Sequence, residues 1–376
     1  MEKIIVLDIG SGFCKIGFGG EPHPRYIYPS IVGKPKKERK NTFIGYAENC
    51  DQIEDVGENC KAAIQNISYP IIKGKINDWE GVKALIEHGF DLLIGKKDIQ
   101  NHPIVITDSI YGERESRLKI AELMFNEYHA SHFYVDYQPF FSLTSKIGYS
   151  TGLVVEIGDG VTQIFPCIGT MPLKTGMMKY PIGGSMITRF LLKILNIQEL
   201  NANHLHDLSI IKERYCRVSL DFLDEKSKIK EKQFEYKNHL FQIGVQQIEG
   251  PEILFDPPMD TMYEEGIHHI INNSILSCKE STQDYLYENI ILSGGVVATK
   301  GFKERLEKEL CSLAPNRKIK ITALPNPNES AWRGASRYSK YPKYFLENFA
   351  ISRKEYEQYG SDVIENRCFS LGNNGK

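Results

Sequence analysis

The chain lacks long apolar runs, paired cysteine motifs and an excess of either charge. No apolar run approaches the roughly 18 residues of a membrane-spanning helix, and the four apolar residues before Asp8 are too few for a signal peptide. Its eight cysteines and ten histidines show no metal-ligand spacing, which argues against a disulfide framework and a transition-metal site. A formal net charge of −2 gives no reason to expect nucleic acid or a membrane as partner. We therefore expect an intracellular chain with reduced thiols.

Two common nucleotide-binding signatures are missing as well. No Gly-x-x-x-x-Gly-Lys-Ser/Thr run occurs, so the chain is not a P-loop protein. Gly10-Ser-Gly12 continues as Phe13-Cys14-Lys15, so the third glycine of a dinucleotide fingerprint is lacking. With 376 residues, 41% of them apolar, the chain is long enough for two or more domains with large cores.

Two similar glycine-rich segments, Asp8-Ile-Gly-Ser-Gly12 and Glu156-Ile-Gly-Asp-Gly160, each follow a short apolar run and precede another. This pattern predicts two β-hairpins. Glycines at a hairpin tip allow backbone N–H groups to converge on an anion, and a carboxylate at the strand end can hold Mg²⁺ through water. The duplication therefore favours a site for a nucleotide triphosphate gripped by both hairpins. Lys15 follows the first tip and either reaches a phosphate or lies on the surface.

The rest of the chain alternates between strand and helix patterns, which indicates an α/β fold. Helical spacing covers residues 76–94, 115–128, 185–195, 209–222 and 301–313, with Ser185 as a predicted helix cap. Strands are predicted at 102–107, 133–135 and 290–292, and a hairpin at 234–243. Ser293-Gly294-Gly295 joins the last of these strands to a helix, and this turn suits either a nucleotide or close packing alone.

Taken together, these motifs resemble the actin family over about residues 4–369. The resemblance rests on an ordered series: Asp8-x-Gly-Ser-Gly-x-x-Lys15, Pro29-Ser-Ile-Val-Gly33, Tyr69-Pro-Ile71, Trp79, Gln138, Ser142-Leu143, Gly158-Asp-Gly-Val-Thr162, Gly184, Lys212-Glu-x-x-Cys216, Gly266-Ile-His268, Ser293-Gly-Gly295, Trp332 and Arg367-Cys-Phe369. It implies an actin-like ATPase fold of two duplicated α/β lobes, in four subdomains, around a nucleotide cleft. The implied subdomains are 1–33 with 69–147 and 331–376, then 34–68, then 148–180 with 266–330, and finally 181–265.

The resemblance also implies the ligands and their residues, namely ATP or ADP with Mg²⁺ or Ca²⁺. Asp8 and Glu156 would hold the cation and its waters. The phosphates would be held by Ser11, Gly12, Lys15, Asp159, Gly160 and Val161. The adenosine pocket would be lined by Gly184, Lys212, Glu213, Gly294 and Gly295. Gln138 would orient the attacking water, and the two lobes would rotate about a hinge near this residue.

Several positions depart from the actin pattern. Glu156 replaces an aspartate and places its carboxylate one methylene further out. Gln163 replaces a histidine that assists the attacking water, so the implied ATP hydrolysis is slow or impaired. The charged segment 36–41 and Met259-Asp-Thr261 replace apolar contacts of filament-forming actins, which favours a dedicated actin-related subunit over a self-polymerising actin.

The implied role is a nucleotide-switched cytoskeletal subunit that assembles with itself or with other actin-family subunits. Profilin-like or cofilin-like proteins are further implied partners, and residence is cytoplasmic or in a nuclear complex. The alternative is a small-molecule kinase of the sugar type on the same fold, for which Asp136 near the hinge would be the catalytic base.

Overall fold

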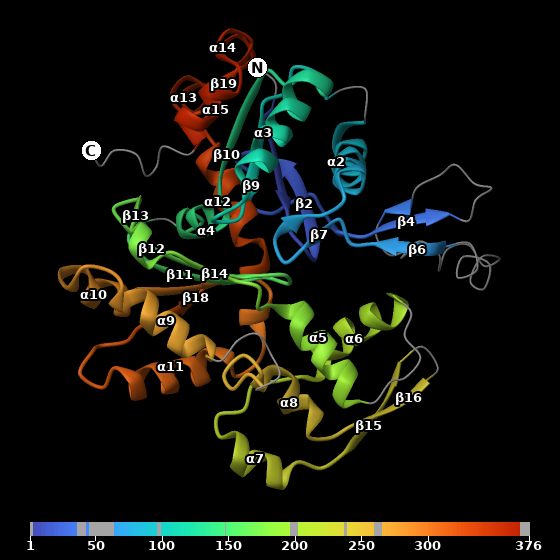
Figure 1. The fold of residues 1–376 in the computed structure, drawn as a ribbon, viewed down its shortest axis with the longest axis vertical. Helices are drawn as coiled ribbons and strands as arrows, with labels where there is room; N and C mark the ends of the chain where they lie inside the picture. The colour runs from blue at the N-terminus through green and yellow to red at the C-terminus, as the bar shows by residue number, and fades with distance from the viewer. Residues whose placement is uncertain are drawn as a thin grey trace. The chain divides into compact units, whose positions relative to one another are not determined.

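A computed structural model describes residues 3–35, 43–44, 64–95, 99–146, 148–195, 202–236, 239–258 and 265–368. The chain forms two compact units (Figure 1). The first unit comprises Met1–Ser150, Gly169–Pro172 and Glu329–Lys376, and the second comprises Thr151–Ile168 and Leu173–Asn328. Each unit is described by itself below.

The first unit is built on a six-stranded sheet with the order β19-β10-β9-β1-β2-β3. These strands are β1 (Ile5–Ile9), β2 (Phe13–Phe18), β3 (Tyr26–Pro29), β9 (Ile104–Asp108), β10 (His132–Tyr137) and β19 (Ile351–Ser352). Smaller sheets contain β4 (Val32–Pro35), β5 (Phe43–Ile44), β6 (Ile64–Ser68), β7 (Ile71–Ile72) and β8 (Lys75–Ile76). The helices are α2 (Trp79–Ile94), α3 (Arg114–Glu122), a π-helical segment (Leu123–Glu127), α4 (Gln138–Thr144), α12 (Ser330–Tyr338), α13 (Pro342–Asn348), α14 (Arg353–Tyr359) and α15 (Ser361–Cys368). Strand β13 (Met171–Pro172) also belongs to this unit.

The second unit has a sheet in which β12-β11-β17-β18 are neighbours and β14 also pairs with β12. Its strands are β11 (Gly152–Ile157), β12 (Thr162–Ile168), β14 (Met178–Tyr180), β15 (Lys232–Tyr236), β16 (His239–Ile243), β17 (Ile290–Ser293) and β18 (Ile321–Ala323). Its helices are α5 (Gly184–Ile194), α6 (Ala202–Tyr215), α7 (Phe222–Lys228), α8 (Gln246–Glu252), α9 (Ile267–Leu276), α10 (Glu280–Tyr287) and α11 (Phe302–Leu313). Short 3₁₀ segments cover Lys174–Gly176, Val296–Ala298 and Pro327–Glu329.

The two units repeat one arrangement of three strands. In the first, β1 pairs antiparallel with β2 and parallel with β9. In the second, β11 pairs antiparallel with β12 and parallel with β17. Both predicted glycine-rich hairpins are therefore confirmed, and each has a parallel strand beside its first strand. The duplication extends further than the glycine motifs from which it was predicted.

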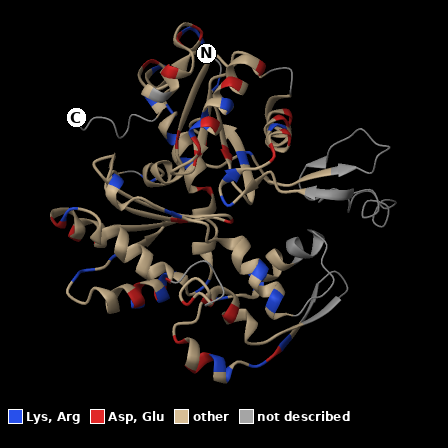
Figure 2. Cartoon of the chain, in the orientation of Figure 1, with Lys and Arg blue, Asp and Glu red and all other residues tan. Residues whose placement is uncertain are grey.

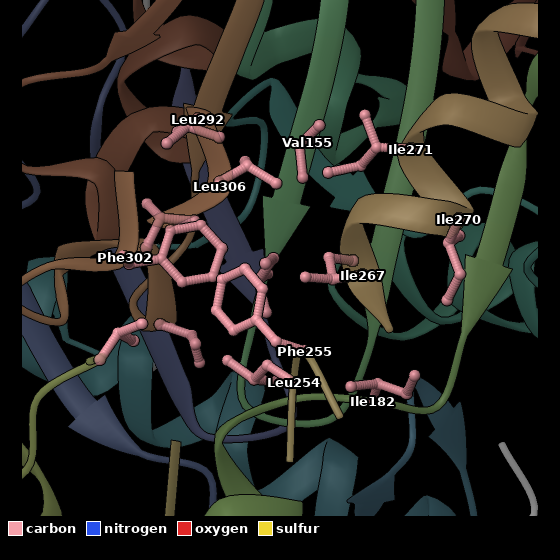
Figure 3. Packing of buried hydrophobic residues seen from close by; sticks show 14 of the residues in the cluster. Val155, Ile182, Leu254, Phe255, Ile267, Ile270, Ile271, Leu292, Phe302 and Leu306 are labelled. Carbon is pink, nitrogen blue, oxygen red and sulfur yellow. The ribbon is translucent and has the colours of Figure 1, made fainter. Parts of the chain in front are cut away.

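Each unit has its own apolar core. In the second unit, Phe255 of the segment after α8 packs on Phe302 of α11 with ring centroids 5.7 Å apart, and Val155, Ile271 and Leu292 belong to the same cluster of buried side chains (Figure 3). In the first unit, Trp332 of α12 is fully buried and donates its Nε1–H to the Val6 carbonyl at 2.9 Å. The helix carrying Trp332 thereby fixes the central strand of the sheet.

Two local predictions were wrong. The predicted helix over 209–222 is interrupted, because α6 ends at Tyr215 and the N–H groups of Arg217 and Val218 bond to the carbonyls of Gln247 and Lys300. Ser185 was predicted to cap the helix over 185–195, but α5 begins one residue earlier and the Ser185 Oγ donates to the Asp159 carbonyl at 2.8 Å. In both places a long-range hydrogen bond replaces the local one that the sequence favoured.

Lysine, arginine, aspartate and glutamate side chains are interspersed along the described parts of both units (Figure 2). Among the helices that the structure describes, none combines the length and the apolar character that crossing a membrane requires. The charged segment 36–41 and Met259–Thr261 lie outside the described residues, so the predictions made for them stay predictions.

Candidate functional site

The tip of the first hairpin is held by Ser30, which follows β3. Its Oγ donates to the Gly10 carbonyl at 2.6 Å, and its N–H donates to the Gly12 carbonyl at 3.0 Å. Because C=O and N–H point in opposite directions across a trans peptide, the N–H groups of Ser11 and Phe13 point away from Ser30. Two amides at the tip are thus turned to one side, as in an anion-binding loop.

Asp8 is the central residue of the candidate site residues in the first unit. It is 3% exposed and accepts hydrogen bonds from the Lys15 Nζ at 2.7 Å, from the Gln138 Nε2 at 2.9 Å and from the Thr107 hydroxyl. Burial raises the pKa of Asp8, but the Lys15 charge and these three hydrogen bonds outweigh it and hold the pKa below the ordinary value of 3.8. Asp8 is therefore a carboxylate at neutral pH. Lys15 is buried beside it and is not a surface lysine.

Glu156 repeats this arrangement in the second unit. The side chain is 7% exposed and accepts from the Ser293 Oγ at 3.0 Å and from the Gln163 Nε2 at 3.4 Å. The registers match, since Asp8 lies opposite Lys15 and beside Thr107, while Glu156 lies opposite Gln163 and beside Ser293. Each hairpin thus presents a carboxylate supported by a hydroxyl from the neighbouring parallel strand. The two arrangements differ at the residue opposite the carboxylate, which is Lys15 with its ammonium group in the first unit and Gln163 with its amide in the second.

The start of α5 holds the tip of the second hairpin. The N–H groups of Gly184 and Ser185 donate to the carbonyls of Gly158 and Asp159 at 3.0 and 2.9 Å. The N–H groups of Asp159 and Gly160 consequently point away from α5. Gly183 permits this approach, because a Cβ there would lie 2.5 Å from the Asp159 carbonyl oxygen. Val161 closes the turn by accepting the Gly158 N–H at 2.9 Å.

Lys212 of α6 reaches the same corner of the second unit. Its Nζ donates to the Gly184 carbonyl and to the Thr188 Oγ1, both at 3.0 Å. Burial raises the pKa of the Asp159 carboxyl, and the positive charges of Lys212 and Arg189 partly offset this rise. Glu213, the next residue of α6, has an exposed side chain.

Gly294 and Gly295 have different roles after β17. Gly294 has a φ of +89°, and a Cβ there would lie 2.3 Å from the Ile157 carbonyl oxygen, so close packing alone requires glycine. A Cβ on Gly295 would meet no atom within 4 Å among the described residues. Of the two glycines, Gly295 is therefore the one that borders open space suited to a ligand.

The structure adds residues that sequence reasoning missed. Thr107 and Ser293 orient the two carboxylates, and Ser30 turns the first tip. Thr107 is the next-to-last residue of β9 and Ser293 is the last residue of β17, and both strands run parallel to a hairpin strand, so a hydroxyl near the carboxyl end of such a strand was the available signal. Asp136, the base of the kinase alternative, is only 4% exposed and is engaged by Tyr134 and the Tyr137 N–H, which does not suit a group that must reach a substrate.

The residues of each unit, taken by itself, fit part of a nucleotide with a hydrated cation. In each unit the hairpin tip turns backbone amides away from the segment that holds it, which suits phosphate, and a buried carboxylate precedes the tip, which suits a cation that keeps most of its waters. Within the described ranges, no three His, Cys, Asp or Glu side chains are grouped as direct metal ligands. Asp8 and Gln138 are brought together in the first unit, and Glu156 and Gln163 in the second.

A comparison with protein-family models identifies the family. The model described as Actin matches residues 1–208 and 204–369, which together cover nearly the whole chain.

Proposed function

Because the chain belongs to the actin family, we propose that it binds ATP or ADP with a divalent cation and works as a nucleotide-switched subunit of an assembly. The observation that carries this proposal is the pair of matched hairpins, each with a buried carboxylate beside a hydroxyl and a tip whose amides face one way. The family match does not favour the small-molecule kinase alternative.

In this proposal Asp8 and Glu156 hold water molecules of the cation, Mg²⁺ or Ca²⁺. The phosphates contact Ser11, Gly12, Lys15, Asp159, Gly160 and Val161. The backbone N–H of Phe13 joins them, since it is turned the same way as that of Ser11. The adenosine contacts come from Gly184, Lys212, Glu213, Gly294 and Gly295. The bound cation supplies charge compensation for the phosphates.

Gln138 and Gln163 determine how fast ATP is hydrolysed. An amide both donates and accepts hydrogen bonds, so Gln138 can orient a water molecule. Gln163 cannot take up a proton as an imidazole does, and we therefore expect slow hydrolysis. Assembly involves this chain itself or other actin-family subunits in the cytoskeleton. Proteins resembling profilin or cofilin are further proposed partners, and the proposed location is the cytoplasm, with a nuclear complex as the second location.

The test is sedimentation of the purified protein with Mg²⁺-ATP over a concentration series, with nucleotide retention and phosphate release followed in the same samples. A critical concentration with phosphate release supports a filament-forming subunit. Nucleotide retention without pelleting supports a subunit of a dedicated complex. Failure to retain Mg²⁺-ATP at micromolar concentration would contradict the proposal.

Gln163→His tests the explanation of slow hydrolysis. We expect phosphate release to increase by about tenfold or more, within the range that a positioned acid or base contributes. The matched control is Gln358→His on α14, which makes the same change at an exposed position of the first unit. Equal phosphate release by Gln163→His and the unaltered protein would refute the role given to Gln163.

A further inference from the structure

Asp136 is an acidic residue in aromatic surroundings. It lies on β10 two residues after Tyr134, so both side chains are on the same face of the strand. The Tyr134 hydroxyl donates to the Asp136 Oδ2 at 2.7 Å, and the Tyr134 ring packs on Tyr338 and Phe345 with centroids 6.0 and 5.4 Å away. Burying a carboxylate among aromatic side chains costs free energy, and an apolar residue would pack there at lower cost. Residues that depart from the hydrophobic pattern of a core in this way tend to occur at functional positions.

The second hydrogen bond of Asp136 points to what the carboxylate does. Its Oδ1 accepts the Tyr137 N–H at 2.7 Å, which fixes the peptide between the two residues. Tyr137 is the last residue of β10 and directly precedes α4, whose first residue is Gln138. The Gln138 Nε2 in turn donates to the Asp8 Oδ1 at 2.9 Å. One carboxylate therefore holds the backbone from which the side chain next to Asp8 extends.

Other charged and titratable groups around Asp136 support the same junction. Arg117 of α3, which is paired with Asp108 of β9, lies over the Tyr137 ring with its Cζ 4.9 Å from the centroid. Asp136 also interacts electrostatically with Arg117 and Asp108, with Tyr338 of α12 and with Cys368 of α15. Tyr137 is thus held at its ring by Arg117 and at its N–H by Asp136.

We propose that Asp136 is a positioning residue for Gln138, which fixes the β10–α4 junction so that the Gln138 amide is aimed at Asp8. The inference rests on the proposed nucleotide and cation site. It explains why an acidic residue is buried among aromatic side chains. It also implies that the geometry of the junction between β10 and α4 affects the affinity for Mg²⁺-ATP. Asp136 itself does not contact the nucleotide in this proposal.

A double-mutant cycle tests the proposal on the full chain, with Mg²⁺-ATP as the probe and equilibrium affinity as the readout. Asp136→Ala is expected to weaken binding about tenfold, the lower end of what outer partners of metal-site groups contribute. Asp136→Asn keeps an oxygen that accepts the Tyr137 N–H and should stay within about threefold of the unaltered protein. In a Gln138→Ala background, Asp136→Ala should cause no further loss, because its effect passes through Gln138.

Two further variants keep the test decisive. Tyr134→Phe removes one hydrogen bond of Asp136 without removing the carboxylate, and its smaller loss should also vanish in the Gln138→Ala background. Asp362→Asn, an exposed site on α15, is the charge-matched control and should leave the affinity unchanged. Additive losses in the cycle, or unaltered affinity in Asp136→Ala, would overturn the proposal. If the unaltered protein itself fails to bind Mg²⁺-ATP, the proposed function is refuted instead.

Discussion

Replacing Asp136 by asparagine should raise the free energy of unfolding, and this gain should grow with increasing pH. Burial raises the pKa of Asp136 from 3.8 to about 7 in the folded state. Between these two values the folded chain keeps a proton that the unfolded chain has lost, so stability falls as the pH rises through this window and is level above it. Asparagine carries no charge and avoids the loss, while its amide can still bond to Tyr134 and Tyr137.

The magnitude follows from the pKa. Raising a carboxyl pKa from 3.8 to about 7 costs the folded state at most about 4 kcal/mol above pH 7. The difference between Asp136→Asn and the unaltered protein should therefore grow from near zero at pH 4 to this upper limit at pH 8. Thermal unfolding followed by circular dichroism at pH 5, 6, 7 and 8 measures it, with the exposed Asp362→Asn as control. A difference that is constant over this range, or a variant less stable at pH 8, would refute the reasoning.

Substitutions at four other positions test the structure through thermal or urea unfolding. Gly294→Ala should destabilise the protein by about 2 to 3 kcal/mol because of its positive φ and the nearby Ile157 carbonyl, whereas Gly295→Ala should change stability by less than about 0.5 kcal/mol. Equal effects would contradict the roles given to the two glycines. Thr107→Val should cost about 1.5 to 3 kcal/mol by removing a hydrogen bond to the buried Asp8 carboxylate, whereas Thr107→Ser keeps the hydroxyl and should retain most of the stability. A serine variant as unstable as the valine variant would show that the methyl group matters instead. Trp332→Phe should cost about 1 to 3 kcal/mol, because the buried hydrogen bond to the Val6 carbonyl is lost and the smaller ring fills less of the core. Unchanged stability would show that this hydrogen bond contributes little.

Local patterns predicted the parts of the fold that depend on local chemistry. The two hairpins followed from apolar runs broken by glycine, and α11 followed from Phe302, Leu306 and Leu310 on one buried face. Asp8 and Glu156 were predicted as site residues because each stands at the start of a glycine-rich turn, and the structure places both in buried positions on the hairpins. In these cases the residues that determine the structure are neighbours in the sequence.

The rest depended on contacts between distant residues. The pairing of Thr107 with Asp8 is set by the register of two parallel strands, which no local pattern records. The end of α6 is set by the carbonyls of Gln247 and Lys300, which lie far along the chain. Asp136 was read as a candidate base because an acid near a hinge suits that role, and only its burial and its bond to the Tyr137 N–H exclude it.

The chain path of the first unit has a consequence for synthesis. The last segment of that unit starts at Glu329 and carries Trp332, which is fully buried against β1 near the amino terminus. The second unit runs from Thr151 to Asn328 with one short interruption. On the ribosome, the second unit is therefore complete before the first can close its core, although the first begins earlier. During that interval the apolar surface that Trp332 covers in the folded unit is exposed, and it stays so until α12 emerges.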